Sequence, residues 1–279
     1  MSNRTVDRMR SNVTASVVER EDVRPVPCPA IVLAGGRASP DFVRTTGISN
    51  RALIRLGNVT LLEIIVNALN DSSMVSDIYV VTSDTPPDGT IQIDPADSFV
   101  GNVLAGLDRC ESAERAVIAT SDMPFVHADA VRTFVTAATR LDTDLVYPIT
   151  PVGICRASYP DLKRTALALR EGVFTGGNMV VVRPAALQRI RGRILEAYDA
   201  RKSPLRLAAM LGPGITAGVL LTLITRRGWL GLRRIETAAS RLLRIDCRAL
   251  VIDDPVLATD LDRPEDLEII LKMKREQAN

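Results

Sequence analysis

The sequence is poor in the residues that several classes of functional site require. Only one of its 279 residues, His127, is a histidine, so the chain cannot form a histidine-rich metal site and has little scope for a Ser-His-Asp triad. Such a lone histidine more often caps a helix or packs. The four cysteines, Cys28, Cys110, Cys155 and Cys247, are far apart and form no Cys-x-x-Cys pair, which indicates buried thiols in a reducing compartment.

Aromatic residues and excess charge are also scarce. Phe, Trp and Tyr together make up 4% of the chain, which is few for a series of base-stacking platforms. The 35 basic and 33 acidic residues leave a net charge of +2, so no overall field attracts a polyanion. We therefore do not expect nucleic acid to be a main partner.

Hydrophobic runs of membrane-spanning length are missing as well. Residues 1–27, an expected loose extension, lack the apolar centre of a secretory signal, so we expect a cytoplasmic protein. The most apolar segment, 214–225, is shorter than the roughly 20 residues that a spanning helix needs. It favours a buried or interface helix. Peripheral membrane contact through 205–231 is the alternative, supported by the arginine pairs at 226–227 and 233–234.

From Cys28 onward, short β-branched runs alternate with longer helical ones, a pattern typical of a mostly parallel sheet covered by helices. The pattern predicts strands over 30–34, 77–82, 91–93, 116–120, 145–148, 178–182 and 249–252. It predicts helices over 60–69, 99–110, 128–140, 184–198, 204–211, 215–227, 235–244 and 264–274. Residues 37–50 are expected to form a loop, and Thr60 and Glu63 a capping box. We interpret residues 28–279 as one domain, with 149–245 as an added, partly helical subregion.

The first predicted strand stops abruptly at Gly35 and Gly36. This pair alone is equally typical of a tight turn and of a phosphate-binding turn, because glycine permits unusual backbone angles and close approach. When the strand–helix–strand connections all have the same handedness, the carboxyl ends of the parallel strands lie at one edge of the sheet. The other residues expected at that edge therefore decide between the two interpretations.

Three further segments are expected at this edge. They are a basic loop around Arg51, a strand end at Asp122, and the acidic cluster 259–267. A lone aspartate after a strand is more often a turn or capping residue, and Asp260 and Asp262 could simply cap the last helix. Carboxylates of this kind also suit Mg²⁺, which one or two of them can hold while leaving positions free for phosphate oxygens.

Together these segments resemble the MobA-like NTP transferases, nucleotidyltransferases of the glycosyltransferase-A-like fold. Residues 33–36 are similar to the family's opening signature, and residues 50–57 to the segment in which Arg51 stands in place of the usual lysine. Residues 121–124 are similar to the family's strand-end metal aspartate, and residues 261–268 to its terminal Val-Asp-Thr-Pro-Glu-Asp-Leu-Glu pattern. Residues 36–40 depart from its Gly-x-Gly-x-Arg loop. The resemblance covers nearly the whole chain beyond residue 28.

The resemblance implies a three-layer α/β/α fold and transfer of an NMP moiety from an NTP to a phosphorylated small molecule, with release of pyrophosphate. It implies GTP or CTP as the NTP and Mg²⁺ as cofactor, and it makes 149–245 the acceptor side. The implied catalytic residues are Arg37, Arg51 and Asp122, and the implied metal ligands are Asp122 and Asp262, with Asp260 as the substitute. The implied nucleotide-binding residues are Leu33, Ala34, Gly35, Gly36, Ser98, Gly101 and Asn102. The implied acceptor-binding residues are Thr175, Gly176, Gly177 and Asn178.

Two other functions stay open at this point. A glycosyltransferase of the same fold would use a nucleotide sugar, although residues 121–123 lack the Asp-x-Asp pair common in such enzymes. A nucleotide-binding regulatory module would use the 205–231 helices as a partner or membrane surface. The basic pairs at 163–164 and 201–202 would each suit an anionic acceptor. We also expect that the chain can form a homodimer.

Overall fold

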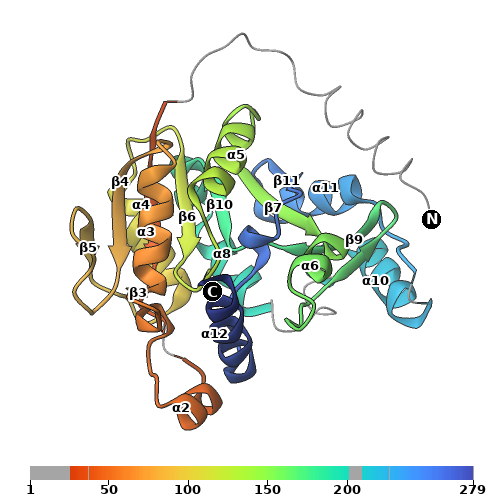
Figure 1. The fold of residues 1–279 in the computed structure, drawn as a ribbon. Helices are drawn as coiled ribbons and strands as arrows, with labels where there is room; N and C mark the ends of the chain where they lie inside the picture. The colour runs from red at the N-terminus through yellow and green to blue at the C-terminus, as the bar shows by residue number, and fades with distance from the viewer. Residues whose placement is uncertain (1–25, 37, 201–208, 226, 279) are drawn as a thin grey trace.

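The computed structural model describes residues 26–36, 38–200, 209–225 and 227–278 (Figure 1). Several sequence predictions lie outside this part of the chain. They are the catalytic residue Arg37, the basic pair at 201–202, nearly all of the extension over 1–27, and most of the helix over 204–211.

The first half of the central sheet is parallel. Its strands are β1 (Cys28–Leu33), β4 (Val75–Val81), β5 (Ile91–Ile93) and β6 (Ala116–Thr120), in the order β5-β4-β1-β6. The inner strands β1 and β6 are almost wholly buried, because helices cover both faces of a parallel sheet. Leu33 pairs with Thr120, so the carboxyl ends of β1 and β6 lie side by side.

The second half of the sheet is mixed. β10 (Met179–Val182) runs antiparallel between β6 and β7 (Leu145–Pro151). β11 (Cys247–Val251) pairs with β7 in parallel, whereas β9 (Gly172–Gly176) is antiparallel to β7 and to β8 (Leu167–Leu169). β2 (Arg55–Leu56) and β3 (Val59–Thr60) form a separate short ribbon. The sheet as a whole is mostly parallel, as predicted.

Side-chain alternation along β1 divides the core between the two faces of the sheet. Ala30 and Val32 belong to the core on one face, and Ile31 and Leu33 to the core on the other. The first face is covered by α2 (Pro40–Thr46), α3 (Leu61–Asp71), α5 (Ala128–Thr139) and α12 (Pro264–Ala278). The second is covered by α4 (Phe99–Arg109), α7 (Pro184–Arg189), α8 (Arg191–Ala200) and α11 (Leu232–Leu243). The predicted three-layer α/β/α fold is therefore confirmed (Figure 1).

A third, smaller core lies beside β8 and β9, where α10 (Pro213–Thr225) packs on the sheet. Ile215 of α10 joins Phe174 of β9 and Leu230 in this core. Within the described ranges, no helix has both the length and the apolar character that crossing a membrane requires.

Most predicted elements occur within a few residues of their expected bounds. The predicted capping box is present at α3, where Thr60 Oγ1 accepts from the Glu63 amide at 3.1 Å and the Glu63 carboxylate accepts from the Thr60 amide at 2.6 Å. His127 caps α5, since its Nδ1 accepts from the Ala130 amide at 3.3 Å. This is one of the two ordinary roles expected of a lone histidine.

Three predictions about local structure were wrong or incomplete. The expected loop over 37–50 contains α2, which Ser39 caps and which ends at Gly47 with a φ of 73°. The predicted helix over 184–198 is interrupted at Ile190, which ends α7. The interval between the predicted strands at 145–148 and 178–182 contains α6 (Val152–Ser158), β8 and β9. These elements are short, so few residues can display their periodicity.

Candidate active site

Arg51 joins two aspartates at the carboxyl edge of the sheet. It lies in the short helix η1 (Arg51–Leu53), after the capping residue Asn50. Its Nη2 is 3.0 Å from Oδ2 of Asp122, which follows β6, and its Nη1 is 2.7 Å from Oδ1 of Asp262, which precedes α12. The Leu261 amide donates to the Asp122 carbonyl at 2.9 Å, which fixes the two aspartate-bearing segments to each other. Three predicted site residues are thus brought together.

Two of the aspartates at this edge, Asp122 and Asp260, have raised pKa values. Burial raises the pKa of Asp122 above its ordinary value, against the opposing effect of the Arg51 charge. Oδ1 of Asp122 is buried and has no hydrogen-bond partner among the described residues. Burial and the charges of Asp262 and Asp122 raise the pKa of Asp260 to about 7. The cluster therefore has a surplus of negative charge that a cation would relieve.

The donor set is compatible with a hard divalent cation. Among the described residues, no group of three or more His, Cys, Asp and Glu side chains is arranged as a metal site. Mg²⁺, however, is often held by only one or two carboxylates, because water and substrate phosphates supply the other ligands. Asp122, with its unpartnered buried oxygen, and Asp262, which faces the same guanidinium, fit such a site.

The glycine turn lies at the same edge, directly after β1. The Ala34 amide donates to the Val81 carbonyl of β4 at 3.0 Å, and Asn50 Nδ2 donates to the Ala34 carbonyl at 3.2 Å. A Cβ at Gly35 would lie 2.9 Å from Pro95 Cβ, whereas a Cβ at Gly36 would meet no atom of the other described residues within 4 Å. Gly35 is therefore required by packing, and Gly36 is open to an approaching group.

The other predicted nucleotide-binding residues, Ser98, Gly101 and Asn102, border this turn. A Cβ at Gly35 would also lie 3.4 Å from Asn102 Nδ2, so the turn and the start of α4 are neighbours. Ser98 Oγ caps α4 by accepting from the Gly101 amide at 3.0 Å, and Asn102 Oδ1 accepts from the Ala96 amide at 2.7 Å. Within the described residues these side chains shape the loop before α4.

The predicted acceptor residues Thr175 to Asn178 also reach the edge. The Asn178 carbonyl accepts from the Thr120 amide at 3.0 Å, two residues before Asp122. A side chain at Gly176 would collide with the Tyr147 hydroxyl, and a Cβ at Gly177 would lie 2.8 Å from Pro148 Cγ. The two glycines therefore allow this segment to pass closely along β7. Thr175 is buried in β9.

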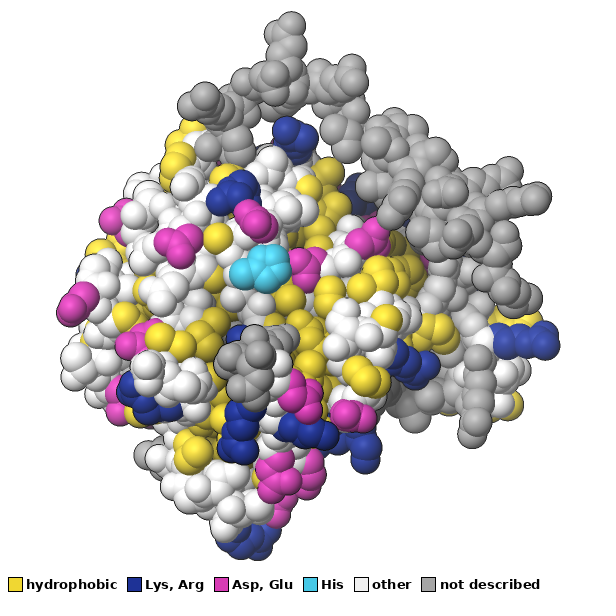
Figure 2. Space-filling view, viewed as in Figure 1, with side chains coloured by type: hydrophobic (Ala, Val, Ile, Leu, Met, Phe, Trp, Pro, Cys, Tyr) yellow, Lys and Arg dark blue, Asp and Glu magenta, His cyan; other side chains and the backbone are white. Residues whose placement is uncertain are grey.

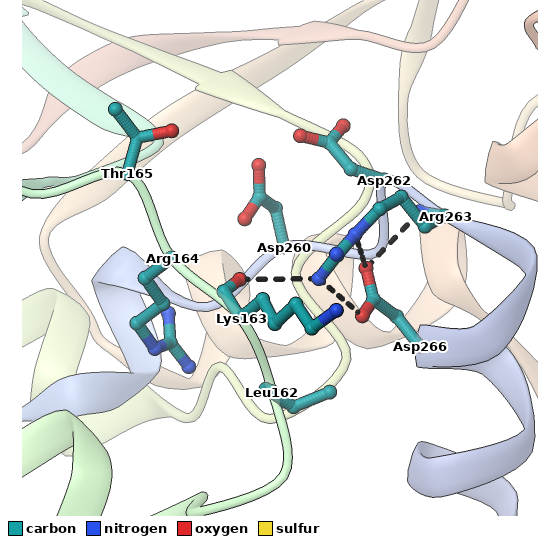
Figure 3. A pocket seen from close by; sticks show the side chains of 8 residues that line it. All are labelled: Leu162, Lys163, Arg164, Thr165, Asp260, Asp262, Arg263 and Asp266. Carbon is teal, nitrogen blue, oxygen red and sulfur yellow. Dashed lines mark hydrogen bonds and ion pairs between the residues drawn. The ribbon is translucent and has the colours of Figure 1, made fainter.

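A pocket of about 350 Å³ opens beside Asp262 (Figure 3). The loop before β8 faces the loop before α12 across it. Its lining residues are Leu162, Lys163, Arg164, Thr165, Asp260, Asp262, Arg263 and Asp266.

The charged side chains of this pocket differ in whether they have a hydrogen-bond or ion-pair partner. Arg263 Nη2 pairs with Asp266 Oδ1 at 3.0 Å, and Arg164 Nη2 donates to Thr259 Oγ1 at 2.7 Å. Lys163 is exposed and has no ion pair with a described residue. The pocket therefore offers one unpaired ammonium group next to the aspartate cluster.

Comparison with known proteins identifies the family. A model of the MobA-like NTP transferase domain matches residues 30–209. The chain belongs to the MobA-like NTP transferase family. A hypothetical transferase from Thermus thermophilus is 30% identical, with a TM-score of 0.74 over 87% of this chain and 100% of that chain. Comparison with curated proteins gives no significant match.

More distant solved structures share the fold. The 2-C-methyl-D-erythritol 4-phosphate cytidylyltransferase from Thermus thermophilus is 14% identical, with a TM-score of 0.50 over 88% of this chain and 98% of that chain. The CMP:2-keto-3-deoxy-manno-octonic acid synthetase complexed with CTP is 12% identical, with a TM-score of 0.54 over 90% of this chain and 100% of that chain.

In this MobA-like chain, the structure adds polar residues that the sequence argument missed. Asp84 follows β4 at the same edge, and its Oδ2 accepts from Asn50 Nδ2 at 2.8 Å. Asn50 thereby ties the glycine turn to the end of β4. Asp84 follows a parallel strand, as Asp122 does, and could therefore be predicted at this edge on the same ground. Arg263 and Asp266 of the pocket carry no such signal, because their positions suit an ordinary helix start. Figure 2 shows acidic and basic side chains interspersed on the visible face, as the near-balanced charge predicts.

Proposed function

We propose that this MobA-like NTP transferase moves an NMP moiety from an NTP to a phosphorylated small molecule and releases pyrophosphate. The observation that carries the proposal is the meeting of Arg51, Asp122 and Asp262 at the sheet edge that also holds the glycine turn. Transfer of a nucleotidyl group requires positive charge and hydrogen-bond donors around the phosphate oxygens. It also requires the NTP and the acceptor to be held next to each other.

The NTP side is the edge formed by the turn after β1 and the loop before α4. Gly36 offers a backbone amide with no side chain to obstruct a phosphate. Arg51 is close enough to this turn to offset the charge of the leaving pyrophosphate, since Asn50 contacts the Ala34 carbonyl. The cytidylyltransferase and CTP-bound relatives support CTP, and the family resemblance supports GTP.

Asp122 and Asp262 would hold Mg²⁺ in this proposal, with Asp260 as a further carboxylate nearby. When bound, the ion would polarise the α-phosphate and offset charge on the phosphate oxygens. Arg51 lies between the two carboxylates. It would turn towards the phosphates when the carboxylates bind Mg²⁺. The chain thereby compensates part of the aspartate charge before substrate binds.

The acceptor side is the opposite flank of Asp122, formed by residues 175–178 and the pocket beside Asp262. Lys163 would attract an anionic acceptor to this pocket. An oxygen of the acceptor phosphate attacks the α-phosphorus and forms a phosphoanhydride bond. The bond from the α-phosphorus to the bridging oxygen breaks, and its electron pair leaves with pyrophosphate. An ionised phosphate nucleophile needs no general base.

Pyrophosphate release from the pure protein tests this function. The protein would be incubated with each of the four NTPs, Mg²⁺ and a pool of sugar phosphates, polyol phosphates and cofactor precursors. We expect release that depends on one NTP and one acceptor, is lost in Asp122→Asn and is retained in Asp41→Asn, a surface control. NTP binding without release under every acceptor would favour a regulatory module. NDP release from a nucleotide sugar would instead indicate glycosyl transfer.

A further inference from the structure

The helix α10 is apolar around its whole circumference. Its sequence, Pro-Gly-Ile-Thr-Ala-Gly-Val-Leu-Leu-Thr-Leu-Ile-Thr, contains no charged residue. One side packs on the small core beside β8 and β9, through Ile215 and Val219. An ordinary surface helix is polar on its other side, because water covers it. The side of α10 that faces away from this core therefore lacks the charged residues of an ordinary surface helix.

Large hydrophobic side chains of this segment are exposed. They are Leu220, Leu221, Ile224 and Trp229, and Ile224 is 79% exposed. The hydroxyls of Thr222 and Thr225 donate to the carbonyls four residues earlier, at 2.8 and 2.6 Å, so they present little polarity to the outside. We call these four exposed apolar side chains the α10 surface.

The sequence on both sides of α10 is rich in basic residues. Residues 200–235 contain seven basic residues and no acidic residue. Of the described ones, Arg227, Arg233 and Arg234 are exposed, and Arg234 lies against Gly214 at the start of α10. Glu171 is the carboxylate that reaches this region, and it is engaged by the Leu232 amide at 3.1 Å. Among the described residues, three exposed arginines thus follow the apolar helix closely in the chain, and one of them lies against its start.

We propose that the α10 surface binds peripherally to a membrane containing anionic lipids. The apolar side chains would enter the boundary between headgroups and acyl chains, while the arginines contact the anionic headgroups. A tryptophan beside such a helix suits this boundary, because its large ring prefers the interface. Thirteen residues are too few to span a bilayer, so α10 lies along its surface.

A second copy of the chain is a less suitable occupant. A two-fold symmetric dimer places the same patch on both sides of the interface, so the arginines at 227, 233 and 234 of one copy would face a patch of the same charge on the other. Their like charges would repel each other. α10 also lies at the opposite end of the molecule from β5 (Figure 1), so a membrane bound at α10 would lie away from that edge of the sheet.

The chain carries its own reporter for the test, since Trp229 is its one tryptophan. Vesicles of phosphatidylcholine alone and of equal parts phosphatidylcholine and phosphatidylglycerol would be titrated into the full chain. We expect a blue shift of the tryptophan emission and co-sedimentation with the mixed vesicles. Raised salt should weaken both, because it screens the arginine charges. Neither readout depends on the proposed enzymatic activity.

Ile224→Glu should weaken this partitioning by about tenfold or more, because a charge would have to enter the apolar layer. Val26→Glu is the matched control, since Val26 is also 79% exposed but lies away from α10 in the chain, and it should bind as the original chain does. Thermal unfolding checks that both variants are folded. Arg227→Glu/Arg233→Glu should also lose binding, whereas Arg109→Glu/Arg156→Glu carries the same charge change and should retain it.

Several results would overturn the proposal. They are no blue shift with anionic vesicles, equal binding to phosphatidylcholine alone, or equal binding of Ile224→Glu and Val26→Glu. A concentration-dependent dimer in sedimentation, abolished by Ile224→Glu while vesicles are not bound, would assign the α10 surface to a second copy instead.

Discussion

Arg51 is the residue through which separate parts of the chain meet. Its guanidinium pairs with Asp122 after β6 and with Asp262 before α12, and it donates to the Leu261 carbonyl at 3.1 Å. A planar guanidinium can serve several acceptors in fixed directions, whereas a lysine ammonium is a compact point charge. The contacts seen here therefore depend on the geometry of an arginine as well as on its charge.

Replacing Arg51 by glutamine should affect both stability and chemistry. The buried Asp122 would lose its partner, so we expect the free energy of unfolding to fall by about 1.5–3 kcal/mol and kcat/KM by about 100-fold or more. Urea unfolding and the pyrophosphate assay measure the two effects. Adding Asp122→Asn should restore part of the stability but none of the activity.

Arg44→Gln is the control for that experiment, because Arg44 pairs with Asp41 at 3.0 Å while both side chains are exposed. An exposed pair contributes less than about 1 kcal/mol. A loss of stability in Arg51→Gln no larger than in Arg44→Gln would contradict the role given to the Arg51 ion pairs.

The sequence indicates which residue types gather at the edge, but it does not indicate their contacts. Asp122 could be predicted there because it follows a buried parallel strand. That Arg51 spans Asp122 and Asp262 could not be predicted, because the reach of a long side chain depends on its rotamer and on how two distant loops pack. The choice between Asp260 and Asp262 has the same cause. Asp262 contacts Arg51, and both Asp260 and Asp262 line the pocket.

In the turn after β1, two adjacent glycines have different surroundings. Gly35 packs against Pro95 and the Val81 carbonyl, where an added Cβ would lie at 2.9 and 3.3 Å. Gly36 has open space around it. One glycine thus holds β1, β4 and the loop before α4 together, and the other leaves the backbone accessible.

Alanine at each glycine separates these tasks. Gly35→Ala should lower the free energy of unfolding by about 1–3 kcal/mol, the usual cost of overpacking. Gly36→Ala should leave stability unchanged but weaken NTP binding by about tenfold or more, because the added methyl group would obstruct the approach of a phosphate to the backbone amide. Urea unfolding and calorimetric titration with NTP measure the two quantities. Unchanged NTP affinity in Gly36→Ala would argue against a phosphate at this turn.

Elements with strong local signals could be predicted, and others could not. β6 and α3 show a continuous buried run and a capping box, so their places follow from the sequence. α2 also has its start and stop signals, Ser39-Pro40 and Gly47, but only Phe42 of its residues is buried, so no apolar period marks it. β8 and β9 depend on pairing with each other and with β7, which is not a local property.

At the scale of the whole molecule, the two large cores place the thiols away from water. Cys28 belongs to the core under α3 and α5, and Cys110 and Cys247 to the core under α4 and α7. All four cysteines are free and buried, as their scattered positions predicted. Burial raises the pKa of Cys28, Cys110 and Cys247 from 9.0 to about 11.

These thiols should make stability fall in alkaline solution. The unfolded chain releases their protons near pH 9 and the folded chain near pH 11, so their contribution is complete below pH 9 and is lost as the pH rises from 9 to 11. Urea unfolding across this range should show a smaller decline in Cys28→Ala/Cys110→Ala/Cys247→Ala than in the original chain. Equal declines would show that other groups cause the effect.

Nucleotidyl transfer differs from other group transfers in the fate of the α-phosphorus of the NTP. The protein would be given NTP labelled at the α-phosphorus in one sample and at the γ-phosphorus in another, with Mg²⁺ and the acceptor found by the pyrophosphate assay. We predict that the α label appears on the acceptor and the γ label in pyrophosphate. With Asp122→Asn, both labels should remain in the NTP. A γ label on the acceptor would mean phosphoryl transfer and would contradict the account, as would the absence of any labelled acceptor.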